Sequence, residues 1–148
     1  MSEESNSQAS RVWFKQAVED LDVARLLCAN GHYALAMFHA QQSAEKSIKS
    51  VSLAMDIDLG RDHYLRLLLK KFPENISKNF IAKIPSLFKL DQYYMQTRYP
   101  DMFGNQAAPV EMFGKRDAEE AIVLASKTMD TTRKLLPNLI EKNDLGER

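Results

Sequence analysis

Four polar side chains recur along one stretch of the sequence at intervals that match the turns of a helix. These residues are His39, Gln42, Lys46 and Lys49, and they are separated by three, four and three positions. On a helix, these spacings place all four side chains in one stripe. Lysine ammonium groups bind phosphate, and glutamine or histidine hydrogen bonds to the edge of a base. The stripe therefore predicts a nucleotide or nucleic-acid site. The alternative is a solvated or dimer-facing surface with a helical Glu45–Lys49 ion pair.

A second group that could bind phosphate is Arg98, in the segment TRYPDMFG at residues 97–104. Pro100 restricts Tyr99 to an extended conformation, so a helix that reaches this segment should end near Arg98. A cation there is stabilised by the helix dipole, and Asp101 is close enough in sequence to pair with it. Two other interpretations stay open. The guanidinium is a planar fork for a nucleotide phosphate, or it is the cation of a catalytic pair.

Asp20 lies among alanine and leucine residues, close to the apolar side of its predicted helix. An unpaired buried charge is costly, so this carboxylate needs a partner. The candidate partners are Lys46, Lys49 and Arg98. We interpret Asp20 as half of an internal ion pair that fixes the register of two helices. A place in the ligand site is the alternative.

The other reactive residue types do not form a metal or nucleophile site in the sequence. His63 opens a helical segment without a second histidine or cysteine at ligand spacing, so it is interpreted as a capping or packing residue. Cys28 is the single cysteine and has apolar neighbours, which indicates a packing role and excludes an internal disulfide. No metal site and no cofactor are predicted.

The elements that position these residues are helices, because apolar residues recur at helical spacing and no segment alternates with a period of two. The predicted helices are residues 10–30, 33–55, a shorter one at 63–72, 76–96 with a break or offset at Pro85, and 115–135. A two-residue break between the first two predicts an antiparallel hairpin. The expected fold class is all-α, an antiparallel up-down bundle of four long helices plus a short fifth helix.

The chain divides into one domain with two short ends. Residues 1–9 are predicted to be a disordered leader, residues 10–140 the helical bundle, and residues 141–148 a flexible tail. Within the bundle, the long connection after residue 96 is typical of a functional or mobile segment. One side of the second helix carries only small residues, which allow close approach of another helix. These residues are Ala36, Ala40, Ser43 and Ser47.

Composition limits the classes of partner. Twenty basic and twenty acidic residues cancel, so no overall field draws the chain to nucleic acid or to an anionic membrane. No apolar run approaches the roughly 20 residues of a membrane span, and the acidic, serine-rich start does not resemble a signal peptide. We therefore expect a cytoplasmic protein without a membrane partner.

Four fragments, in order, carry a family resemblance. The first two make up the first hairpin. One is a tryptophan with Ala-x-x-Asp-Leu, and the other, after a glycine turn and an aromatic residue, is Gln-Gln-x-x-Glu-Lys-x-x-Lys. The later fragments are DHYLRLLL and TRYPD. The matching residues of the hairpin are Trp13, Ala17, Asp20, Leu21, Tyr33, Phe38, Gln41, Gln42, Ala44, Glu45, Lys46 and Lys49. Over about residues 11–135 the chain resembles the HEPN family, in its prokaryotic branch with the RYPD signature.

The resemblance implies a helical bundle, usually a homodimer, with a link to nucleotides or RNA. Some HEPN proteins are metal-independent ribonucleases with an Arg-x(4–6)-His motif late in the bundle. Others accompany minimal nucleotidyltransferases in toxin–antitoxin pairs. Here no histidine follows Arg98, and Arg25 and His32 have the motif spacing only at the first hairpin turn. The resemblance thus favours a non-enzymatic module over an enzyme.

Three functional hypotheses follow. The first is a binding or accessory module for a nucleotide or nucleic acid, partnered with a minimal nucleotidyltransferase. The second is a divergent metal-independent ribonuclease toxin. The third is a structural dimer that binds another protein. The predicted ligand-binding residues are Lys46, Lys49, Arg98, His39, Gln42 and Asp20, with no catalytic residue assigned. Trp13, Glu45, Tyr99 and Asp101 are predicted to be structural or signature residues.

Overall fold

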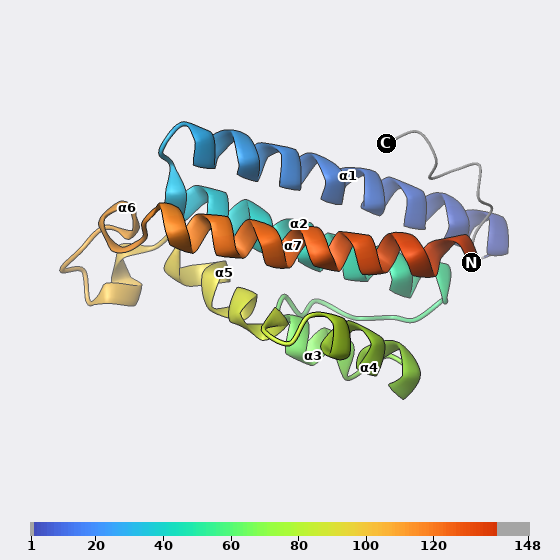
Figure 1. Cartoon of the computed structure of the whole chain (residues 1–148). Coiled ribbons are helices and arrows are strands. Elements are labelled where there is room, and N and C mark those ends of the chain that lie inside the picture. The colour runs from blue at the N-terminus through green and yellow to red at the C-terminus, as the bar shows by residue number, and fades with distance from the viewer. Residues whose placement is uncertain (1, 139–148) are drawn as a thin grey trace.

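The computed structural model describes residues 2–138, which form helices and contain no strand. Three long helices pack side by side: α1 (Glu3–Ala29), α2 (Tyr33–Ala54) and α7 (Lys115–Leu135) (Figure 1). Four short helices complete the chain: α3 (Leu65–Leu69), α4 (Glu74–Lys83), α5 (Tyr93–Gln96) and α6 (Pro109–Met112). The all-α class is confirmed, and none of the helices within this part of the chain is long and apolar enough to cross a bilayer.

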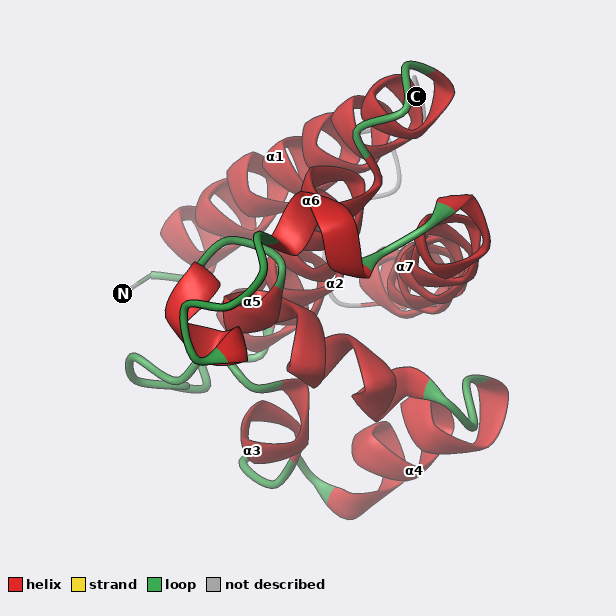
Figure 2. Cartoon of the chain, turned by 90° about the vertical axis from the view of Figure 1, so that its left-hand side faces the viewer, coloured by secondary structure: helices red, strands yellow, loops and turns green. Residues whose placement is uncertain are grey.

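The short helices α3, α4 and α5 lie on the side of α2 and α7 that faces away from α1 (Figures 1 and 2). We call α1, α2 and α7 the long-helix side, and the region from α3 to α6 the short-helix side. The α1–α2 hairpin forms as predicted, with Gly31 at a φ of 84° in the turn. A positive φ costs glycine little, so the chain reverses sharply here.

Residues 76–96, where a long helix with a break or offset at Pro85 was expected, form a shorter helix, a 3₁₀ helix and a single helical turn. The shorter helix is α4, which ends before Pro85 because proline lacks an N–H and keeps Ile84 out of the helical region. A 3₁₀ helix, η1 (Leu87–Gln92), follows and leads into the single turn of α5. Leu87 and Leu90, three residues apart, are both buried, a spacing that suits three residues per turn.

The first helix is longer than the sequence pattern suggested. Residues 3–9, for which a disordered leader was expected, form its first turns, and the Ser2 hydroxyl accepts a hydrogen bond from the backbone N–H of Ser5 as an N-cap. Ser10, the first residue of the predicted helix, is instead buried within it and donates to the backbone oxygen of Ser50 at 2.7 Å. The predicted tail at residues 141–148 lies outside the described residues.

Small residues on α2 permit the close packing of the long-helix side. Ala36 and Ala40 are fully buried. Ser43 donates through its hydroxyl to the backbone oxygen of Ala17 on α1 at 2.7 Å. Ser47 donates to Thr132 on α7 at 2.7 Å. These hydroxyl contacts join all three long helices. The small-residue pattern predicted the close approach of a helix but not these hydrogen bonds.

The connection between α5 and α7 contains a 3₁₀ turn, η2 (Pro100–Phe103), and α6, rather than irregular chain throughout. A second 3₁₀ turn, η3 (Leu136–Asn138), follows α7. The bounds of α7 agree with the prediction. Gly114 precedes it, and Asp117 accepts a hydrogen bond from the Gly114 backbone N–H.

Candidate functional site

The first element of the site is a carboxylate held between two helices. Asp20 on α1 is 6% exposed. It accepts hydrogen bonds from the Lys46 ammonium at 2.6 Å and from His39 Nδ1 at 3.2 Å, both on α2. The predicted internal partner is therefore Lys46, and His39 joins the pair.

A second carboxylate, Glu45 on α2, also binds one lysine and one histidine. Glu45 is 3% exposed and accepts from the Lys49 ammonium at 3.2 Å and from His63 Nδ1 at 3.2 Å. Gln41 Nε2 lies 3.5 Å from Glu45 and donates to the backbone oxygen of His63 at 3.1 Å. Gln42 in turn donates to the side-chain oxygen of Gln41.

The two histidines are thus held in the same way. A carboxylate only accepts hydrogen bonds when ionised, so the Nδ1 atoms of His39 and His63 carry protons. When such a ring is neutral, its Nε2 atom is a hydrogen-bond acceptor. His39 and His63 are 31% and 43% exposed in their side chains, so solvent and ligands can reach both rings.

Arg98 follows α5 and lies in a different environment. Its guanidinium carbon is 4.2 Å from the ring centre of Phe38 and 4.8 Å from those of Tyr94 and Tyr99. Nε donates to the backbone oxygen of Tyr94 at 2.9 Å. Within residues 2–138, Arg98 forms no ion pair, and the expected pair with the exposed Asp101 is absent.

Aromatic rings connect Arg98 to both histidines. His63 stacks on Tyr94 at 4.7 Å with an interplanar angle of 14°. Tyr94 lies 6.4 Å from Phe38, whose ring is 5.4 Å from that of His39. The stripe predicted on α2 and the predicted Arg98 therefore meet at one surface of the protein.

We call this surface the α2 polar face. It consists of His39, Gln42, Glu45, Lys46 and Lys49 on α2, Asp20 on α1, His63 in the loop before α3, and Tyr94 and Arg98 on the short-helix side. The fold brings all six predicted ligand-binding residues to it. The prediction missed Tyr94, and it gave His63 only a capping or packing role.

The electrostatics of the two buried aspartates differ. Burial alone would raise the pKa of Asp20, but the hydrogen bonds and charges of His39 and Lys46 outweigh it and lower that pKa below its ordinary value of 3.8. Asp91 on η1 accepts instead from the backbone N–H groups of Leu65 at 2.6 Å and Arg66 at 3.2 Å. Burial dominates there and raises the pKa of Asp91 above 3.8.

The arrangement of side chains on this surface defines the class of chemistry that it can perform. Protonated donors, two oriented imidazoles and an arginine on aromatic rings suit an anionic ligand with planar groups. Among the described residues, no group of three or more histidine, cysteine, aspartate or glutamate side chains is placed to hold a metal ion.

The chain belongs to the HEPN domain family, because the sequence model of the HEPN domain matches residues 10–135. The match spans α1 to the end of α7 and includes the whole α2 polar face. The resemblance of the four sequence fragments is thereby confirmed.

Three relatives are similar to this chain. The protein named "Putative toxin MJ1304" of Methanocaldococcus jannaschii is 28% identical over 138 residues, which cover 88% of this chain and 90% of that protein. The crystal structure of TT1696 from Thermus thermophilus superposes with a TM-score of 0.74 at 32% identity, over 84% of this chain and 96% of that one. ST0689, described as an archaeal HEPN homologue, has a TM-score of 0.65 at 34% identity, over 84% and 95%.

Proposed function

We propose that this protein is the HEPN component of a toxin–antitoxin pair, and that its α2 polar face binds RNA or a nucleotide. The relative named as a toxin supports the toxin–antitoxin setting. The partner in this proposal is a minimal nucleotidyltransferase, and the protein itself is a homodimer.

The observation that carries the binding proposal is the environment of Arg98. Among the described residues this guanidinium has no carboxylate partner, and it rests on Phe38, Tyr94 and Tyr99. Stacking fixes the plane of the group and leaves its charge uncompensated. Such a guanidinium is suited to a phosphate, and the exposed ring of Tyr99 beside it is suited to a base.

Binding can be tested with a short, fluorescein-labelled single-stranded RNA and fluorescence anisotropy. Arg98→Gln should weaken binding about tenfold or more, because a charge-assisted contact to phosphate is lost. Arg116→Gln, which removes an exposed positive charge at the start of α7, is the matched control and should bind like the natural protein. Equal affinity of Arg98→Gln and the control would exclude this site.

The two carboxylate–histidine pairs favour a second candidate function, metal-independent RNA cleavage. In this reaction one imidazole Nε2 removes the proton of a 2′-hydroxyl, and the 2′-oxygen attacks the phosphorus. The second, protonated imidazole gives its proton to the departing 5′-oxygen, which leaves a 2′,3′-cyclic phosphate. Arg98 or Lys46 would stabilise the charge on phosphorus.

Cleavage can be followed on the same RNA by gel electrophoresis with a chelator present. His39→Gln and His63→Gln should each reduce the rate by about a hundredfold if they are acid and base. His32→Gln, at the exposed hairpin turn, should leave the rate unchanged. Absence of cleavage by the natural protein would leave the binding proposal alone.

A further inference from the structure

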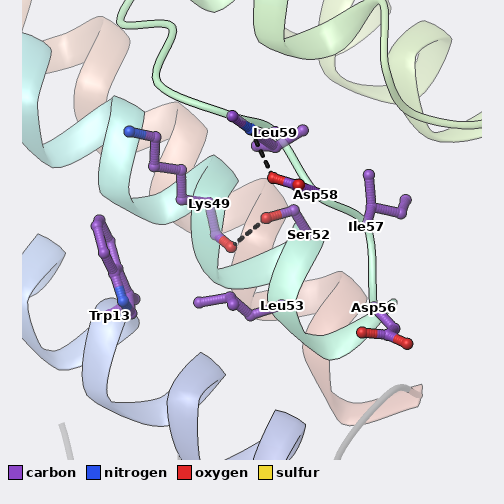
Figure 3. A pocket seen from close by; sticks show the side chains of 9 residues that line it. Trp13, Lys49, Ser52, Leu53, Asp56, Ile57, Asp58 and Leu59 are labelled. Carbon is purple, nitrogen blue, oxygen red and sulfur yellow. Dashed lines mark hydrogen bonds between the residues drawn. The ribbon is translucent and has the colours of Figure 1, made fainter. Parts of the chain in front are cut away.

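A pocket of about 350 Å³ lies at the Lys49 end of the α2 polar face, between α1 and the loop after α2 (Figure 3). Its walls are formed by Trp13 on α1, the last turns of α2 and the loop at residues 56–60. Leu53, Ile57 and Leu59 give it an apolar lining. A volume of this size is in the range of small-molecule sites.

The wall on the α1 and α2 side combines an aromatic ring with a cation. Trp13 is 37% exposed and lines the pocket, so part of its side chain is open to a ligand. The Lys49 ammonium lies 5.6 Å from the centre of its ring. Figure 3 shows both side chains on the same side of the opening.

The opposite wall, formed by the loop, is acidic. Asp56 and Asp58 line it, and one oxygen of Asp58 accepts the backbone N–H of Gly60 at 2.8 Å. This bond orients the Asp58 carboxylate, and its remaining lone pairs can accept further hydrogen bonds. The pocket is therefore polarised, with a donor on the Lys49 side and acceptors on the Asp58 side.

We propose that this pocket binds a guanine base, stacked on Trp13. Guanine presents the acceptors N7 and O6 on one edge, and lysine is one of their common partners. Its neighbouring edge carries the N1–H and N2–H donors, which together match one carboxylate. In this arrangement Trp13 stacks on the face of the base. Lys49 donates to its N7 and O6 edge, and Asp58 accepts from its N1–H and N2–H edge.

Other ligands match the two walls less well. Adenine places the acceptor N1 on the edge that would face Asp58, which repels it. A phosphate inside the pocket would meet both aspartates, so the phosphates of the ligand lie outside. An arginine side chain of a partner protein is planar and rich in donors, but it would bring a second cation next to Lys49 and Trp13.

The inference rests on the proposed function, because the guanine belongs to the same RNA or nucleotide that lies on the α2 polar face. Lys49 is common to both, since it contacts Glu45 of the face and lines the pocket. The pocket would give the protein a preference for RNA with an accessible guanine.

Trp13 is the single tryptophan of the chain, so its fluorescence reports on this pocket alone. Titration with guanosine monophosphate should quench the emission. Inosine monophosphate, which lacks the N2 amine, should bind several-fold more weakly. Adenosine monophosphate should bind about tenfold more weakly, because it loses both hydrogen bonds of the edge that pairs with Asp58. Equal quenching by the guanosine and adenosine nucleotides would overturn the proposal.

Variants separate the pocket from the rest of the site. Asp58→Asn should weaken guanosine monophosphate binding about tenfold, whereas Asp22→Asn, an equal change of charge at an exposed position of α1, should not. Unchanged affinity in Asp58→Asn would refute the assigned contact. Displacement of the nucleotide by an arginine-containing peptide at lower concentration would refute the guanine assignment in favour of a protein partner.

Arg98→Gln distinguishes failure of the inference from failure of the proposed function. It should retain the quenching by guanosine monophosphate while losing affinity for RNA. If Arg98→Gln keeps its RNA affinity and the quenching remains specific for guanine, the pocket proposal is supported and the Arg98 proposal fails. If RNA affinity falls but no nucleotide quenches Trp13, the pocket proposal fails by itself.

Discussion

The long-helix side and the short-helix side treat their buried charges differently. On the long-helix side, Asp20 and Glu45 each bind a lysine and a histidine. On the short-helix side, Asp91 binds two backbone N–H groups, and Arg98 lies on aromatic rings with no carboxylate partner among residues 2–138. The charges between α1 and α2 are thus largely satisfied within the protein, whereas the charge of Arg98 is not.

This difference indicates which cations are available to a ligand. A ligand that approaches Lys46 or Lys49 must compete with a carboxylate within 3.2 Å, and part of the Coulomb energy is lost in that exchange. A ligand that approaches Arg98 displaces no such partner. Mutations on the long-helix side should therefore affect stability first, and mutation of Arg98 should affect binding first.

The largest effect is expected for Glu45→Ala. It removes a buried carboxylate and leaves the mostly buried Lys49 and the partly exposed His63 without their acceptor, so the free energy of unfolding should fall by about 2–3 kcal/mol. Urea unfolding measures this change. Glu119→Ala, which removes an exposed Lys115–Glu119 pair on α7 with the same four-residue separation, should cost less than about 0.5 kcal/mol. Similar losses in both variants would break the comparison.

Asp91→Ala should have the next largest effect. The carboxylate accepts the first backbone N–H groups of α3, as an N-cap side chain does, and loss of such a cap costs roughly 1–2 kcal/mol. The loss should concentrate in the short-helix side, which hydrogen exchange can localise at α3. A uniform loss of protection over α1, α2 and α7 would contradict this expectation.

Asp20→Asn should cost about 1–1.5 kcal/mol at neutral pH, because the amide keeps one hydrogen bond but removes the charge. The pKa of Asp20 is lowered by folding, so its contribution to stability is present above pH 3.8 and is lost as the pH falls through the folded value. The difference between the natural protein and Asp20→Asn should therefore shrink below about pH 4. A difference that grows as the pH falls would mean that the lysine and histidine do not stabilise the carboxylate.

Asp91 should show the opposite pH dependence. Folding raises its pKa, so the folded state binds the proton more tightly, and this contribution to stability is lost as the pH rises from 3.8 through the folded value. Urea unfolding of Asp91→Asn and the natural protein between pH 3 and 6 measures it. The natural protein should lose stability relative to the variant as the pH rises over this window.

Arg98→Gln should have the smallest effect on stability, about 1 kcal/mol or less, from lost ring contacts. Thermal unfolding gives the value, and the RNA titration described above gives the accompanying loss of affinity. A loss of more than about 3 kcal/mol would show that Arg98 is chiefly a structural residue, and it would remove the distinction between the two sides.

Much of the long-helix side could be predicted from the sequence. The sequence of α7 contains neither proline nor glycine. The helical spacing of its apolar residues therefore predicted where the helix begins and ends. The apolar neighbours of Asp20 indicated that its carboxylate is buried. Only a few lysine and arginine residues were at positions from which they could pair with it. The small residues of α2 predicted close helix packing. In each case the information is local or involves one adjacent helix.

The short-helix side could not be predicted to the same depth. The break at Pro85 could be predicted from the sequence. The formation of a 3₁₀ helix rather than an α-helix after it depends on the packing of Leu87 and Leu90, which the sequence pattern does not show. The surroundings of Arg98 depend on Phe38, which is far away in sequence. The helix at residues 3–9 was missed because its polar composition hid the burial of Asn6 and Ser10.

The hydroxyl contacts of Ser43 and Ser47 have a consequence for the motions of the protein. Each bond joins α2 to a fixed point on α1 or α7, so a slide of one helix along another breaks them together. Amide hydrogens of the long-helix side should therefore exchange with solvent mainly by global unfolding, and those of α3 to α6 by smaller openings. Adaptation to different ligands would then fall to the segment that carries Tyr94 and Arg98, while α1, α2 and α7 keep a constant geometry.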